Sequence, residues 1–144
     1  MEKYLINYKS TFDELNDAPI VKGVVLGVLG NSSAAKWTRE TMAEIIMNPL
    51  LEVMERIPEK ILMPTEGTTS MLLQVWAERQ SVPFQAIDSD WIKMGRRARA
   101  LRDSRILKES THLLIFLGTR SDYYERVAIR EAKKGKIVFT VANS

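Results

Sequence analysis

Residues 20–29 have the sequence IVKGVVLGVL, and this stretch decides the expected fold. Apart from one lysine and two glycines, every position is apolar, so hydrophobic side chains would point to both sides of an extended chain. Strands of a parallel sheet that is covered by helices on both faces have this continuous apolar pattern, whereas strands with one face in water alternate apolar and polar residues. The stretch therefore predicts a strand buried on both faces.

Further short apolar runs follow along the chain, and each is bounded by polar residues: residues 60–63, 83–87, 112–117 and 136–141. Longer stretches with helical spacing of their apolar positions separate the runs: residues 37–55, 70–79, 92–108 and 122–134. Hydrophobic strands that alternate with crossover helices predict a three-layer, Rossmann-like α/β fold, with about five mainly parallel strands and helices on both faces.

The expected helices carry local signals at their ends and in one interior. Pro49 removes a backbone donor inside residues 37–55 and should kink that helix or split it in two. Asp122 is a suitable N-cap residue with Glu125 three positions later, and Gly135 is a suitable stop signal for the same helix.

A chain of 144 residues with 45% hydrophobic and 27% charged residues is expected to form one globular domain over residues 1–144. Residues 1–19 do not fit the alternation of strands and helices. They are expected to form an extra N-terminal element, either a helix or an edge element of the sheet.

The composition excludes several kinds of site. The absence of cysteine excludes disulfides, thiolate zinc sites and cysteine nucleophiles. His112 is the one histidine, so a histidine-rich metal site is excluded, and we expect His112 to be structural and the protein to use neither a metal nor a cofactor. No apolar segment reaches the roughly 18–20 residues that a membrane span needs, and the first residues lack the apolar core of a signal peptide. We therefore expect a cytoplasmic protein that does not use a membrane.

Loops that follow the predicted strands are the places to look for a ligand, because open parallel sheets bind ligands at the carboxyl ends of their strands. Two of these loops are rich in glycine and hydroxyl residues and lead directly into helices, as phosphate sites do. The same residues are also common in caps and turns that bind nothing. No dinucleotide fingerprint and no P-loop motif is present. The candidate ligand-binding residues in these loops are Gly30, Asn31, Ser32, Ser33, Thr65, Gly67, Thr68, Thr69, Asp90, Gly118 and Thr119.

Residues 88–105, DSDWIKMGRRARALRDSR, are rich in arginine. Four arginines recur at every third position and would form a slowly drifting stripe along a helix: Arg96, Arg99, Arg102 and Arg105. Ala98 and Leu101 of the same helix would pack against the sheet. An arginine near the start of a helix opposes the helix dipole unless an anion compensates it, which favours a ligand near Arg96. The alternative is a solvated basic face.

Five segments together resemble a known family: PTEGTTS, VWAERQSVPFQAID, SDWIKMGRRARALRDSRIL, THLLIFLGTRS and REAKKGKIVFTV. They are similar, over residues 20–142, to the SLOG superfamily of Rossmann-like domains, especially to its small stand-alone members of the DUF2493 (YspA-like) type. Asp90 and Trp91 match the family's Asp-Trp pair, and Gly95 matches the glycine that follows it. Arg102 matches the arginine of an Arg-Asn pair, with Asp103 in place of the asparagine.

The resemblance has further matches and two departures. Ala132 and Gly135 match the family's closing motif. The first loop has Asn31-Ser32-Ser33 where the family usually has Ser-Arg, and residues 65–68 replace several glycines.

The resemblance implies that the protein binds a nucleotide or a nucleotide-derived ligand at the carboxyl edge of the sheet, as a sensor or a sequestering protein. It adds Trp91 and Arg102 to the candidate site, and we expect Arg102 to pair with a ligand phosphate, or otherwise with Asp90 or Glu66, while Arg97 is solvated. It also implies a homo-oligomer, most plausibly a dimer.

Two alternatives stay open. One is a hydrolase or transferase that acts on the N-glycosidic bond of a nucleotide, like the phosphoribohydrolases of the superfamily, with Glu66 or Glu125 as the catalytic carboxylate. The other is a nucleic-acid-binding protein that uses the arginine-rich helix. A low net charge of +3 and the lack of aromatic residues among the arginines weigh against nucleic acid.

Overall fold

The computed structural model describes residues 5–8, 23–30, 37–65, 67–89, 91–117 and 122–142. These residues form an α/β fold around one six-stranded sheet with the order β1-β6-β5-β2-β3-β4. The strands β2 to β6 run parallel to one another, and β1 pairs antiparallel with β6. The strands are β1 (Leu5–Tyr8), β2 (Val25–Gly30), β3 (Lys60–Pro64), β4 (Phe84–Ile87), β5 (His112–Phe116) and β6 (Ile137–Val141).

The predicted three-layer fold is therefore confirmed. Each of the five apolar runs overlaps a parallel strand, although β2 begins at Val25, later than the run at residues 20–29 predicted. Residues 1–19 were expected to form either a helix or an edge element of the sheet. The described part of this region, residues 5–8, is an edge strand, β1.

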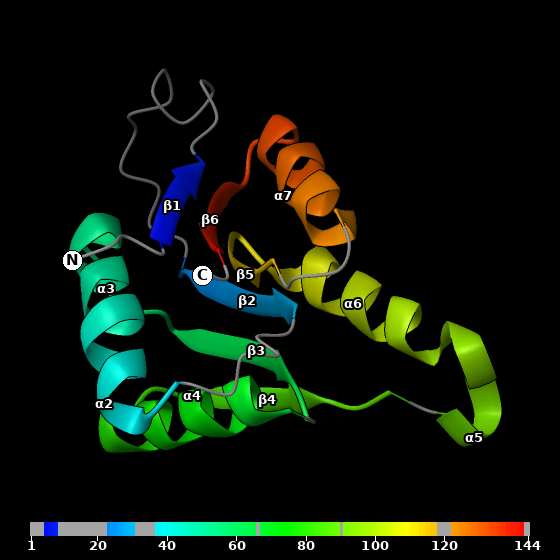
Figure 1. Cartoon of the computed structure of the whole chain (residues 1–144), viewed down its shortest axis with the longest axis horizontal. Helices are drawn as coiled ribbons and strands as arrows, with labels where there is room; N and C mark the ends of the chain where they lie inside the picture. Colours follow the sequence, from blue (N-terminus) through cyan, green and yellow to red (C-terminus); the bar gives the residue numbers. More distant parts are fainter. Residues whose placement is uncertain are drawn as a thin grey trace.

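Helices cover both faces of the sheet, with α3 and α4 on one side and α6 and α7 on the other (Figure 1). Between α5 and α6 lies the short 3-10 helix η2, and a π-helix, η1, lies between α2 and α3. The described helices are α2 (Arg39–Thr41), η1 (Met42–Met47), α3 (Asn48–Met54), α4 (Thr68–Arg79), α5 (Trp91–Met94), η2 (Gly95–Arg97), α6 (Ala98–Glu109) and α7 (Tyr123–Lys133).

The continuous apolar pattern of the strands produces two hydrophobic cores. In β5, Leu114 and Phe116 pack into the core under η1, α3 and α4. Their neighbours Leu113 and Ile115 pack into the core under α6 and α7. All of these side chains have zero exposure, as expected for a strand whose alternate residues point to opposite covered faces.

Gly27 lets α6 approach the sheet closely. A Cβ atom at this position would lie 2.0 Å from Ser110 Oγ and 2.9 Å from Ile106 Cγ2, both at the C-terminal end of α6. The Ser110 hydroxyl also donates a hydrogen bond of 2.5 Å to the Ile106 carbonyl. The glycine inside the apolar run is therefore a packing requirement of the strand–helix contact.

Two local predictions about helices need correction. Of the two effects predicted for Pro49, a kink or a split, the split does not occur, because residues 39–54 stay helical. The helix changes type instead: the Asn48 N–H donates to the Ala43 carbonyl, five residues back, just before the proline that cannot donate. Asp122 does occupy the N-cap position of α7, but its side chain makes no cap hydrogen bond. Its carboxylate instead pairs with Arg126 at 2.6 Å, so the expected capping box does not form.

Within the described ranges, no helix combines the length and hydrophobicity that crossing a membrane requires. The same ranges contain no group of three or more acidic or histidine side chains that could hold a metal ion.

Candidate functional site

The carboxyl ends of neighbouring strands coincide. Gly30 at the end of β2 pairs with Phe116 at the end of β5, and Pro64 at the end of β3 pairs with Ile87 at the end of β4. Because all four strands are parallel, the loops that follow them leave from one edge of the sheet, which is the arrangement that a shared ligand site needs.

Several candidate residues in these loops lie outside the described residues, and so does the first catalytic candidate. They are Asn31, Ser32, Ser33, Glu66, Asp90, Gly118 and Thr119. Trp91 begins α5 and Arg96 lies in η2, but their side chains are likewise not described. Most of the predicted common cleft therefore falls on positions outside the described residues, and the described residues beside them give the geometry of the strand ends.

Gly30 brings the chain of β2 against the end of β5. Its φ is +87°, in the left-handed region that favours glycine. A Cβ atom there would lie 1.9 Å from the Phe116 carbonyl oxygen, which is a backbone atom that cannot turn away. The first loop therefore starts in direct contact with the strand that leads into the fourth loop, and only glycine allows this contact.

Thr65 ties the loop after β3 to the loop after β4. Its hydroxyl donates a hydrogen bond of 3.0 Å to the Asp88 carboxylate, and its N–H donates one of 3.2 Å to the Ile87 carbonyl. The side chains of Thr65 and Asp88 are both exposed. Asp88 is not among the residues predicted from the sequence, although its position directly after an expected strand was a usable signal.

The N-terminus of α4 opens beside this contact. Gly67 is its N-cap residue, with φ of +100°, and offers no side chain to cap the first turn. Among the described atoms, none lies within 4 Å of the place where a Gly67 Cβ would be. Thr68 is exposed, whereas Thr69 is buried with 5% exposure, so of these two predicted ligand residues only Thr68 presents its side chain to solvent.

A buried polar cluster lies between α6 and α7. Arg102, only 6% exposed, donates from Nε and Nη2 to Asp103 Oδ1 at 3.2 and 3.1 Å. The Tyr124 hydroxyl donates to Asp103 Oδ2 at 3.0 Å. Burial raises the pKa of Asp103, and the Arg102 charge and the Tyr124 hydrogen bond offset only part of this shift. Burial together with the Asp103 charge raises the pKa of Tyr124 as well, so the phenol stays protonated and remains a donor.

The pairing of Arg102 with Asp103 was not predicted from the sequence. Adjacent helical residues do not ordinarily face each other, so the spacing carried no signal for it. Arg102 was instead expected at a ligand phosphate, Asp90 or Glu66, and the last two lie outside the described residues.

The expected arginine stripe does not lie on one surface. Arg97 is exposed, as predicted, and so are Arg99 and Arg105, whereas Arg102 is buried. A step of three residues falls about 60° short of a full helical turn, so the stripe drifts across the buried face of α6 at Arg102. Leu101, which was expected on the sheet, is 40% exposed instead.

Two further expectations concern single side chains. Ala98, which was expected to pack on the sheet, is buried with 2% exposure. Glu125, the second catalytic candidate, lies in the first turn of α7 and is exposed.

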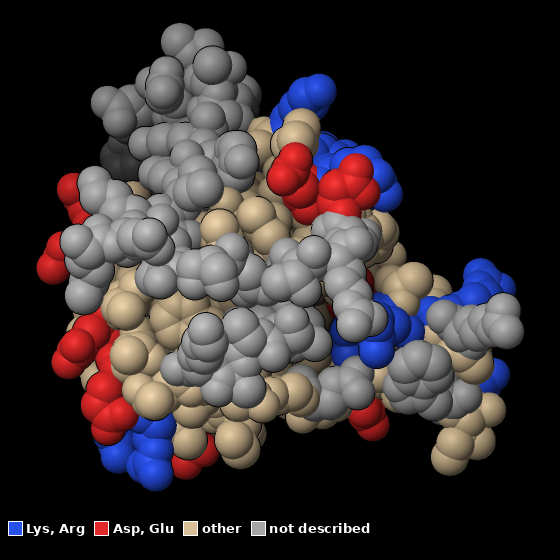
Figure 2. Space-filling view, in the orientation of Figure 1, with Lys and Arg blue, Asp and Glu red and all other residues tan. Residues whose placement is uncertain are grey.

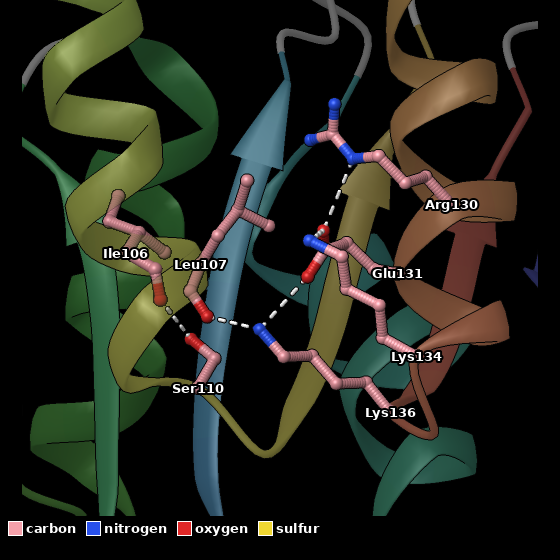
Figure 3. Close-up of polar contacts among 7 residues, drawn as sticks. All are labelled: Ile106, Leu107, Ser110, Arg130, Glu131, Lys134 and Lys136. Atoms are coloured by element: carbon pink, nitrogen blue, oxygen red, sulfur yellow. Dashed lines mark hydrogen bonds and ion pairs between the residues drawn. The ribbon is translucent and has the colours of Figure 1, made fainter.

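A second buried carboxylate, that of Glu131, has a structural role. Its side chain is 2% exposed and pairs with Arg130 at 3.3 Å, Lys134 at 3.1 Å and Lys136 at 2.9 Å. Lys136 also donates to the Leu107 carbonyl in the last turn of α6 (Figure 3). This network joins the C-terminal ends of α6 and α7, and it lies where β6 begins, away from the carboxyl edge.

In comparisons with known proteins, no family model, no curated protein and no solved structure matches this chain. The resemblance to the SLOG superfamily stays a prediction from the sequence motifs.

Proposed function

We propose that the protein binds a nucleotide or a nucleotide-derived ligand at the carboxyl edge of its parallel sheet, as a sensor or a sequestering protein. The observation that carries this proposal is the N-terminus of α4, a helix of 12 residues that begins at Thr68 after the N-cap residue Gly67. No described atom lies within 4 Å of the place where a Gly67 Cβ would be. Helix N-termini attract phosphate because their first N–H groups lack partners within the helix and the dipole is positive there.

Groups next to α4 suit the rest of a nucleotide. The Asp88 carboxylate is held by Thr65 at 3.0 Å, and a carboxylate at this edge of an α/β sheet can accept hydrogen bonds from ribose hydroxyls. Gly30 keeps the neighbouring loop free of a side chain at the strand end. The proposal also draws on the resemblance of the surrounding motifs to SLOG domains.

The proposal is tested by isothermal titration with AMP, ADP-ribose and NAD, using variants of the exposed Thr68. Thr68→Glu places a carboxylate in the first turn of α4. It should weaken binding at least tenfold, about 1.4 kcal/mol, because the carboxylate repels a phosphate there. The same change favours the helix dipole, so the melting temperature should stay the same or rise. Thr68→Gln, of similar size but neutral, is the matched control and should bind nearly as the unmodified protein does.

Equal affinities of Thr68→Glu and Thr68→Gln, or no binding of any of the three nucleotides, would contradict the proposal. Chromatography of the titrated samples tests the hydrolase alternative at the same time. Cleavage of an N-glycosidic bond would release free base, whereas a binding protein leaves the nucleotide intact.

A further inference from the structure

The short helix α5 projects from the protein beyond the carboxyl ends of the strands. In Figure 1 the arrowhead of β2 points towards the side of the molecule on which α5 lies. Among the described elements, α5 mainly contacts its chain neighbours η2 and α6. Figure 2 shows the same region standing out from the body of the molecule, with uncharged residues, drawn tan, at its lower end. The described elements therefore hold α5 mainly through its connection to α6.

Two apolar side chains of α5 are exposed to solvent. Ile92 is 101% exposed and Met94 is 43% exposed. Single exposed apolar residues are common on protein surfaces, so exposure alone does not indicate a ligand. These two residues, however, belong to the helix that follows the loop after β4, and that loop leaves from the carboxyl edge of the sheet. They therefore lie next to the edge at which the nucleotide is proposed to bind.

The chain itself keeps Ile92 close to Asp88. Asp88 follows β4, and its carboxylate, which accepts a hydrogen bond of 3.0 Å from Thr65, is the group proposed to meet the ribose. Each residue of an extended chain spans at most about 3.6 Å, so the Cα atoms of Asp88 and Ile92 lie within about 14 Å of each other in any conformation. The base of a nucleotide whose ribose is bound at Asp88 is therefore within reach of α5.

Gly95 allows the direction of α5 to change relative to α6. Its φ is +56°, in the left-handed region that favours glycine, and no described atom lies within 4 Å of the place where a Gly95 Cβ would be. The segment η2, which begins at this glycine, is a single 3-10 turn between two α-helices. Short 3-10 segments of this kind often mark hinges. The junction at Gly95 is therefore suited to a movement of α5 towards the strand ends.

We infer that α5 supplies the base-binding part of the nucleotide site, and that Ile92 and Met94 close over the base when the phosphate is bound at α4. This inference rests on the proposed function. The face of a nucleobase and an exposed aliphatic side chain both lose contact with water when they pack together, which favours closure. The inference also narrows the class of ligand, because a sugar phosphate without a base has nothing for α5 to cover.

Titration calorimetry with AMP and ribose 5-phosphate tests the inference, because the two ligands share the phosphate and the ribose and differ in the base. The unmodified protein should bind AMP about tenfold or more tightly than ribose 5-phosphate. Ile92→Ser should weaken the binding of AMP about fivefold or more, and should change the binding of ribose 5-phosphate by less than about twofold. Because Ile92 is fully exposed, its replacement should not disturb folding.

Ile57→Ser is the matched control, because Ile57 is 70% exposed and lies just before β3, at the amino ends of the strands. It should leave both affinities unchanged. If Ile92→Ser binds AMP as the unmodified protein does, or loses affinity equally for both ligands, the inference is overturned, while the binding of both ligands leaves the proposed function in place. If the unmodified protein binds neither ligand, the proposed function fails and the inference fails with it.

Discussion

Arg102 and Arg97 show that neighbouring arginines on one helical segment have different physical roles. Arg97 is exposed, whereas Arg102 is buried beside Asp103. A buried ion pair of this kind adds little net stability to the folded protein. Removal of one partner is nevertheless strongly destabilising, because it leaves the other charge buried and uncompensated.

We expect Arg102→Ala to lower the free energy of unfolding by about 3 kcal/mol or more, because Asp103 would lose its counter-charge inside the protein. Arg97→Ala should change it by less than about 0.5 kcal/mol, as surface substitutions usually do. Urea denaturation followed by circular dichroism measures both. Similar losses from the two variants would show that Arg102 is not the buried partner of Asp103.

At the level of helices and strands, Glu131 connects α7 to the end of α6. The link runs through Lys136, which pairs with Glu131 and donates to the Leu107 carbonyl. Burial alone would raise the pKa of Glu131, but the hydrogen bonds and charges of Lys136 and Lys134 outweigh burial and hold the pKa below its ordinary value. A carboxyl group with a lowered pKa in the folded state stabilises the protein when it is ionised.

Glu131→Gln should therefore reduce the free energy of unfolding at neutral pH by about 1.5–3 kcal/mol, the range for a hydrogen bond to a charged group. The lower end is expected, because Arg130 and Lys134 are 55% and 60% exposed and water screens their charges. The difference between the two proteins should be complete above pH 4.5, the ordinary pKa of glutamate, and shrink as the pH falls through the lower folded-state pKa.

Denaturation curves at a series of pH values test this prediction. Glu109→Gln serves as the control, because Glu109 pairs with Arg105 on the exposed surface of α6, at 3.6 Å. Glu109→Gln should change the free energy of unfolding by less than about 1 kcal/mol at neutral pH, as expected for an exposed ion pair. A Glu131→Gln difference that persists undiminished in acid would contradict the role of the ionised carboxylate.

For the whole molecule, the antiparallel strand β1 decides where the sheet ends. β1 pairs with β6 through Leu5–Tyr8 and occupies the edge that β6 would otherwise expose. Four residues of β6 are buried, as in a strand at the centre of a sheet: Val138, Phe139, Thr140 and Val141. An uncovered apolar edge strand is a template for association with other chains.

Removal of residues 1–8 should lower the melting temperature and increase aggregation, because β6 would become the edge strand. Differential scanning calorimetry and static light scattering of the full and shortened chains measure the two effects. A shortened protein with the original melting temperature and no added scattering would show that β1 contributes nothing to the sheet.

The parallel sheet and the helices on its two faces could be predicted from the amino-acid sequence alone. The reason is local: continuous apolar runs such as residues 112–117 specify strands buried on both faces, and the spacing around Asp122 and Gly135 specifies where α7 lies. The position of the candidate site followed from the same information, because loops after parallel strands must leave from one edge.

The contacts between polar groups could not be predicted from the sequence, because they depend on how the elements pack in three dimensions. Thr65 bonds to Asp88 across 23 positions, and Tyr124 reaches Asp103 across 21. Arg102 is buried although its spacing placed it in a stripe with exposed arginines. Hydrophobic periodicity indicates which face of a helix or strand is buried, but it does not indicate which residues of other elements that face contacts. Contacts between elements depend on how closely helices such as α6 pack on the sheet, and that distance is set jointly by residues far apart in the chain, such as Gly27 and Ser110.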